Sequence, residues 1–200
     1  LASGVPGAVA GLWEAHQEFG TLPWAELVEP SIRLADDGFV VDEDLAGSVV
    51  DARRLLERFP ASAELFLPGG EPIQAGQTWR NPDLAKVLRR IAREGPDGFY
   101  RGETAELIVA EMERGGGIIT HEDLAEYETA WRDPVTFDYR GYSVTSMPPS
   151  SSGGATMALM ANILERYDLA ELGWSSAETI HLMAEAWKRA YADRNQLLAD

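Results

Sequence analysis

The stretch Ser146-Met147-Pro148-Pro149-Ser150-Ser151-Ser152-Gly153-Gly154 lies between a strand-like run and an apolar run of helical character. Each proline fixes φ and removes a backbone donor, so the chain leaves the strand stiffly. The serines and glycines then place backbone N–H groups at the start of a helix, where a turn can cradle an anionic or oxyanionic group. Ser151, Ser152, Gly153 and Gly154 are therefore our candidates for a loop that binds substrate or supports a site.

The alternative interpretation of this stretch is a rigid connector between a strand and a helix, because ordered loops serve geometry first. The stretch contains no nucleophile–base pair of its own. Both interpretations stay open at the level of sequence.

Composition limits the classes of protein to which this chain can belong. It has 200 residues, of which 45% are hydrophobic and 25% charged, enough for one sizeable domain or two small ones. A formal net charge of -16 without a basic stripe excludes a nucleic-acid partner and disfavours anionic membrane surfaces. No apolar run approaches the roughly 20 residues that cross a bilayer. Cysteine is absent, which excludes disulfides, zinc–thiolate sites and cysteine nucleophiles.

Neither end of the sequence carries a terminal signal. The N-terminus has no initiating methionine and no signal-peptide pattern, and the last residues have no signal that ends a helix. We therefore expect the chain to be a segment of a longer protein.

Residues 1–127 read as mainly helical, with one loop-rich stretch over residues 60–76. Asp42 and Asn81 are predicted N-caps, the second followed by proline at the first helical position, and Thr21 is a third candidate. Thr120 and Asp123 have the spacing of a capping box.

Residues 128–200 read as a strand pair, the Pro/Ser/Gly loop and two long helices. Thr129–Tyr139 and Tyr142–Ser146 alternate in polarity around a tight turn, which predicts an antiparallel pair. The helices are expected over Ala155–Tyr167 and from a capping box of Ser175 and Glu178 to the end of the chain. The fold class is thus α+β, mainly α-helical with a small antiparallel strand pair.

The residue types that carry metal or nucleophile chemistry form no complete constellation. Glu178, His181 and Glu185 share a helix face, but a di-iron site needs a second Glu-x-x-His, so a solvated or ion-paired face is favoured and no metal is expected. His16 is interpreted as a packing residue, and Trp187 as a core residue. Asp193 and Arg194 are adjacent and do not face each other, so each is expected to reach a separate partner.

Motifs distributed along the whole chain, in order, resemble those of gamma-glutamyltranspeptidases. They are Ser3-Gly4-Val5-Pro6-Gly7-Ala8-Val9-Ala10-Gly11, Phe19-Gly20-Thr21-Leu22-Pro23, Arg33-Leu34-Ala35, Asp37-Gly38-Phe39, Gly95-Pro96-Asp97-Gly98-Phe99-Tyr100, Gly116-Gly117-Ile118-Ile119-Thr120, Asp123-Leu124-Ala125, Tyr139-Arg140-Gly141-Tyr142, the Ser-Met-Pro-Pro loop, Ala184-Glu185-Ala186 and Ala190-Tyr191-Ala192-Asp193-Arg194. Ser150 stands where the family usually has a third proline, which implies a more flexible loop.

The resemblance implies a section of the large subunit of an N-terminal-nucleophile hydrolase with an αββα sandwich. Such a precursor cleaves itself, and the new N-terminal threonine of the small subunit attacks gamma-glutamyl amides such as glutathione. The glutamyl group then passes to water, an amino acid or a peptide. The implied partners are the small subunit of the same precursor and gamma-glutamyl small molecules.

By the same resemblance this chain holds no catalytic residue and needs no cofactor. The arginine that binds the substrate carboxylate would precede Leu1, and the threonine would follow Asp200. The family's usual locations are periplasmic, secreted or cell-surface. Two alternatives remain: a related amidase acting on a cephalosporin side chain or on poly-gamma-glutamate, and a non-catalytic helical interaction module.

Overall fold

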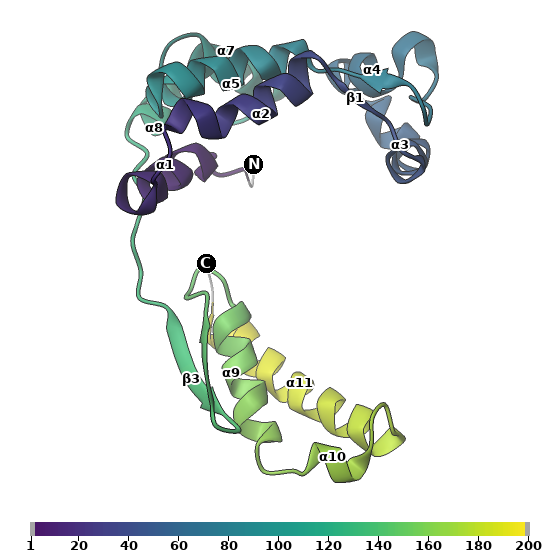
Figure 1. Ribbon diagram of the computed structural model, residues 1–200, viewed down its shortest axis with the longest axis vertical. Coiled ribbons are helices and arrows are strands. Elements are labelled where there is room, and N and C mark those ends of the chain that lie inside the picture. Colours follow the sequence, from purple (N-terminus) through teal and green to yellow (C-terminus); the bar gives the residue numbers. More distant parts are fainter. Residues whose placement is uncertain (1–2, 199–200) are drawn as a thin grey trace. The chain divides into compact units, whose positions relative to one another are not determined.

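The computed structural model describes residues 3–198, which divide into two compact units between Thr129 and Ala130 (Figure 1). Residues 3–129 form the N-terminal unit and residues 130–198 the C-terminal unit. Helices dominate both units, and each described strand belongs to a small antiparallel pair. The predicted fold class, α+β with mainly helical content, is confirmed.

The N-terminal unit is a succession of helices with one two-residue strand pair. In chain order they are α1 (Ala8–Phe19), α2 (Trp24–Asp36), β1 (Phe39–Val40), α3 (Glu43–Leu56), α4 (Pro60–Phe66), the 3-10 turn η1 (Pro68–Gly70), β2 (Thr78–Trp79), α5 (Pro82–Glu94), α6 (Asp97–Tyr100), α7 (Gly102–Gly115) and α8 (His121–Ala125).

Side-chain caps begin several of these helices where the sequence predicts them. The Asp42 carboxylate accepts from the Leu45 N–H at 2.8 Å, and Asn81 likewise caps α5. Thr120 and Asp123 form a reciprocal capping box, and the Thr120 hydroxyl and N–H hold the pKa of the Asp123 carboxyl below its ordinary value. Thr21 does not cap α2, which instead begins after Pro23 without a side-chain cap.

The β1–β2 pair and its surroundings were not predicted. Phe39 pairs with Trp79, and the stretch expected to be loop-rich contains α4 and η1. The Trp79 indole stacks on Phe66 at 5.4 Å between ring centroids and donates Nε1–H to the Leu65 carbonyl at 3.1 Å. Strands of two residues are too short for alternation to reveal them.

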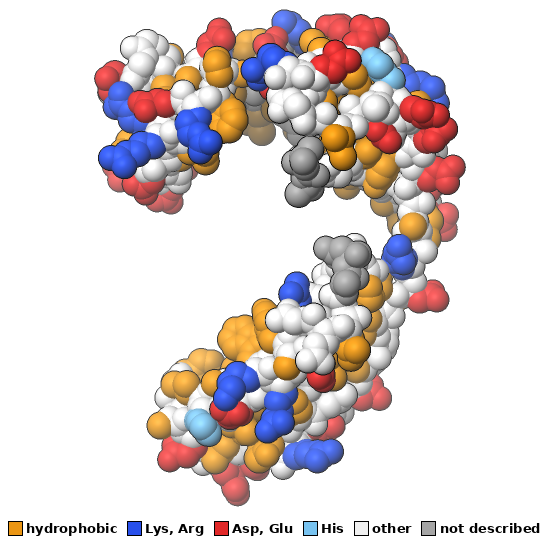
Figure 2. All heavy atoms as spheres, turned by 180° about the vertical axis from the view of Figure 1, so that it is seen from behind, with side chains coloured by type: hydrophobic (Ala, Val, Ile, Leu, Met, Phe, Trp, Pro, Cys, Tyr) orange, Lys and Arg blue, Asp and Glu red, His pale blue; other side chains and the backbone are white. Residues whose placement is uncertain are grey.

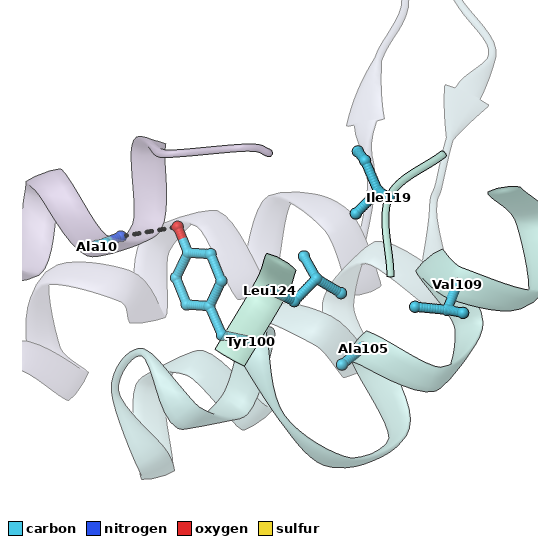
Figure 3. Packing of buried hydrophobic residues seen from close by; sticks show 6 residues of the cluster. All are labelled: Ala10, Tyr100, Ala105, Val109, Ile119 and Leu124. Atoms are coloured by element: carbon cyan, nitrogen blue, oxygen red, sulfur yellow. Dashed lines mark hydrogen bonds between the residues drawn. The ribbon is translucent and has the colours of Figure 1, made fainter. Parts of the chain in front are cut away.

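The main core of the N-terminal unit surrounds Tyr100 (Figure 3). Its buried members come from α1, α6, α7, α8 and the segment before α8: Ala10, Tyr100, Ala105, Val109, Ile119 and Leu124. The Tyr100 side chain reaches α1, where its hydroxyl donates to the Pro6 carbonyl at 2.6 Å and accepts from the Ala10 N–H at 3.3 Å. Burial raises the pKa of Tyr100 above the ordinary value of a tyrosine.

The C-terminal unit begins with β3 (Val135–Tyr139) and β4 (Tyr142–Ser146), which pair in antiparallel register from Val135–Ser146 to Tyr139–Tyr142. Arg140 and Gly141 form the turn with φ of 50° and 83°, the left-handed values that a two-residue hairpin demands. The pair is as predicted, except that β3 begins at Val135 and not at Thr129, directly after Pro134.

Three helices complete this unit: α9 (Gly153–Leu164), α10 (Leu169–Leu172) and α11 (Ala177–Leu197). Helix α9 packs on α11 and on both strands (Figure 1). The cap of α11 is Ser176, whose hydroxyl accepts from the Thr179 N–H at 3.1 Å, so the predicted box of Ser175 and Glu178 is wrong by one residue. This helix was expected to reach the end of the chain, but it stops at Leu197, and residues 199–200 lie outside the described residues.

Acidic side chains are spread over the exposed surface, with apolar patches between them (Figure 2). On α11 the exposed apolar side chains follow helical spacing: Ile180, Met183, Trp187 and Tyr191. Trp187 is 51% exposed, so its assignment to the core is wrong, because α11 turns the small residues Ala186 and Ala190 inward instead. No helix within residues 3–198 has the length and apolarity needed to cross a membrane.

We predict that Tyr100→Phe lowers the free energy of unfolding by about 1–2 kcal/mol, because the buried Ala10 N–H and the part-buried Pro6 carbonyl both lose their partner. Urea denaturation of the whole chain measures this. Tyr142→Phe is the control, since Tyr142 is 76% exposed. Equal stability of the two variants would contradict the bridging role of Tyr100.

Candidate functional site

The four candidate loop residues lie together at the junction of β4 and α9, where the strand ends at Ser146 and the helix starts at Gly153. The turn closes through a hydrogen bond from the Ser151 N–H to the Pro148 carbonyl at 3.1 Å. Ser151 and Gly153 are exposed, Ser152 is half-buried and Gly154 is buried. Within the exposed pair the Gly153 N–H donates to Ser151 Oγ at 3.3 Å.

Gly154 serves the geometry of the turn. A side chain at this position would collide with the carbonyl oxygen of Met147, and its Cβ would lie 3.2 Å from the Cβ of Ser146. The first turn of α9 therefore approaches the end of β4 more closely than any residue with a Cβ permits. For Gly154 the rigid-connector interpretation is the better one.

Ser152 is the N-cap residue of α9, but its hydroxyl does not cap the helix. Its carbonyl accepts twice from Thr156, from the backbone N–H at 2.9 Å and from the hydroxyl at 2.7 Å. Its hydroxyl accepts from Arg194 Nε at 3.0 Å. Ser152 is thus held both through its main chain and through its side chain.

Arg194 is a residue of this site that sequence reasoning did not assign to it. It lies in the last turn of α11, 42 positions after Ser152. The sequence predicted that Arg194 reaches a partner separate from Asp193, and the structure identifies that partner as the loop serine. The sequence signal was that Arg194 directly follows Asp193 in a helix. Adjacent helical residues point to different sides, so Arg194 needed another partner.

Two of the other residues considered for chemistry, Glu185 and His16, have structural partners. The Glu185 carboxylate pairs with Lys188 at 2.6 Å, and this hydrogen bond lowers the pKa of Glu185, as expected for an ion-paired helix face. His16 packs between Trp13 and Trp24 and bonds through Nε2 to the Leu22 carbonyl at 2.7 Å. Residues 3–198 contain no cluster of three His, Cys, Asp or Glu side chains suited to a metal ion.

The whole chain is similar to one family of known enzymes. A family model described as gamma-glutamyltranspeptidase matches residues 1–200. The chain is 46% identical over 201 residues to a glutathione hydrolase proenzyme of Escherichia coli, and 44% identical over 199 residues to an acylase ACY 1 proenzyme of a Pseudomonas species. Both matches include 100% of this chain, but only 35% and 36% of the length of those relatives.

Among solved structures, the chain is similar to gamma-glutamyltranspeptidase from Helicobacter pylori, with a TM-score of 0.96 and 41% identity. The match covers 100% of this chain and 58% of that one. Measured against the two proenzymes above, the chain spans about a third of the length of its curated relatives.

We predict that Gly154→Ala destabilises the chain by about 1–3 kcal/mol, because the new methyl group has no space against the Met147 carbonyl. Gly153→Ala is the matched control: its Cβ would lie 3.4 Å from Ser151 Oγ, an ordinary contact. Thermal unfolding of both variants measures the difference. If the two melt together, the close approach at Gly154 is not a constraint on the fold.

Proposed function

Because this chain belongs to the gamma-glutamyltranspeptidase family, we propose that it is a section of the large subunit of an enzyme that cleaves gamma-glutamyl amides such as glutathione. The match of the family model over residues 1–200 is the observation that carries this proposal. The whole enzyme would be a self-cleaving precursor with an αββα sandwich, and the small subunit would be the partner of this section.

The proposed chemistry is acyl transfer through an N-terminal threonine. The threonine hydroxyl attacks the gamma-carbonyl carbon while its proton passes to the threonine's own α-amino group. The amine of the donor leaves with that proton, and an ester joins the glutamyl group to the threonine. Water, an amino acid or a peptide then attacks the ester, which releases the glutamyl product and restores the hydroxyl.

Within this scheme residues 1–200 help to position the active site and supply no group that reacts with the substrate. The chain supplies neither the threonine nor the arginine that the family uses for the substrate carboxylate. Its contribution would be the turn at residues 146–154, whose exposed Ser151 and Gly153 project from a backbone fixed at Ser152 and Gly154. A fixed turn serves catalysis because reacting groups lose rate quickly when they are misplaced.

A second candidate function is hydrolysis of a different amide. The identity to the acylase proenzyme, 44%, is nearly that to the glutathione hydrolase proenzyme, 46%. Residues 1–200 therefore support both donor classes about equally. In the family, the residues that bind the glutamyl group lie outside the section that residues 1–200 match. We therefore expect those residues to determine which donor the enzyme uses.

We predict that residues 1–200 expressed alone do not hydrolyse a gamma-glutamyl anilide above the rate in buffer, because the nucleophile is absent. Release of the aniline, followed by absorbance, measures this. The full-length parent protein is the positive control. Turnover by the isolated chain would overturn the assignment of a supporting role.

We also predict that the full-length parent yields two polypeptides after expression, the second beginning with a threonine that follows Asp200. N-terminal sequencing of the purified protein identifies both ends. Replacing that threonine by alanine should leave one polypeptide, since the attacking hydroxyl is lost. A wild-type parent that stays uncleaved, or that hydrolyses no gamma-glutamyl amide, would contradict the proposed function.

A further inference from the structure

The contact between Arg194 and Ser152 joins the last turn of α11 to the first residue before α9. Arg194 is half-buried, and its Nε donates to Ser152 Oγ at 3.0 Å. Its Nη1 donates to Asn195 Oδ1 at 2.9 Å, and the guanidinium carbon lies 5.9 Å from the centre of the Tyr191 ring. The guanidinium is therefore oriented by three neighbours.

Several other arginines of this acidic chain pair with carboxylates, as Arg53 does with Glu57, Arg101 with Asp97 and Arg114 with Glu111. Arg194 has no carboxylate within ion-pair distance among residues 3–198, and a neutral hydroxyl accepts from it instead. A guanidinium is a rigid planar donor, so a bond through Nε constrains the position of its acceptor. The contact thus fixes the loop at Ser152.

We propose that Arg194 is a positioning residue that sets the geometry of the exposed Ser151–Gly153 backbone for the acyl transfer described above. The proposal rests on that proposed function. Thr156 holds the Ser152 carbonyl and Arg194 holds its hydroxyl, so one bond restrains the main chain of the residue and the other its side chain. Without Arg194 the main-chain bonds of Ser152 and the Ser151–Pro148 bond of the turn remain, but the Ser152 hydroxyl loses the partner that fixes its position.

A competing explanation is that Arg194 only stabilises α11, because a cation in the last turn interacts favourably with the helix dipole. Ser152→Ala separates the two explanations, since it leaves the charge of Arg194 in place. Arg194→Lys separates them in a second way. It keeps a cation at the end of α11 but loses the planar group that joins Ser152 to Asn195.

The test uses the full-length parent protein with Arg194→Met, Arg194→Lys, Ser152→Ala and the double variant of Arg194→Met with Ser152→Ala. Lys188→Met is the matched control, because it removes an exposed cation from the same helix. Hydrogen exchange of the amides of residues 151–154, followed by mass spectrometry, reports the order of the loop. Steady-state hydrolysis of a gamma-glutamyl anilide reports kcat and KM.

We expect exchange of the loop amides to rise in every Arg194 and Ser152 variant and to stay unchanged in Lys188→Met. We expect kcat to fall about ten-fold in Arg194→Met and Ser152→Ala, with KM within about two-fold, because misplacement acts on the transition state. The double variant should be no worse than the worse single variant, since both remove one contact.

Wild-type exchange and kcat in Ser152→Ala would overturn the proposal, as would effects in the double variant that multiply. Full retention of both properties in Arg194→Lys would favour the helix-charge explanation and also overturn it. If the wild-type parent turns over no gamma-glutamyl donor, the proposed function fails separately. Loop exchange then decides alone whether Arg194 positions the turn.

Discussion

Gly154 brings the first turn of α9 against the carbonyl oxygen of Met147, and the arrangement of the C-terminal unit follows from this approach. Helix α9 can pack on both strands of the hairpin because its start lies so close to the end of β4. The hairpin and α11 each pack on α9. A methyl group at one position would separate the elements that the unit needs together.

The N-terminal unit depends on a polar bridge of a similar kind. The Tyr100 hydroxyl joins α6 to the start of α1 by accepting one hydrogen bond and donating another. The ring also stacks on Tyr127, at 5.6 Å between centroids. Tyr100 thus fixes a junction in one unit through its hydroxyl, and Gly154 fixes one in the other unit by having no side chain. Apolar residues of several helices form the core of the N-terminal unit around Tyr100.

Local signals in the sequence were sufficient for features that local chemistry controls. Asp42, Asn81 and the pair of Thr120 and Asp123 cap their helices as predicted, because a short polar side chain satisfies the free N–H groups of the first turn. The cap of α11 was misplaced by one residue because two serines are adjacent there. The β1–β2 pair was not predicted because each strand has two residues, too few to show an alternation of polar and apolar side chains.

The sequence by itself determined the mainly helical class, the hairpin with its turn at Arg140 and Gly141, the position of the candidate loop and the family. These follow from periodicity, capping residues and motifs that each span a few positions. Only the tertiary structure decided that Arg194 holds Ser152 and that Tyr100 holds Pro6, across 42 and 94 positions of chain. No periodic pattern links residues so far apart, since their contact arises from the packing of whole helices.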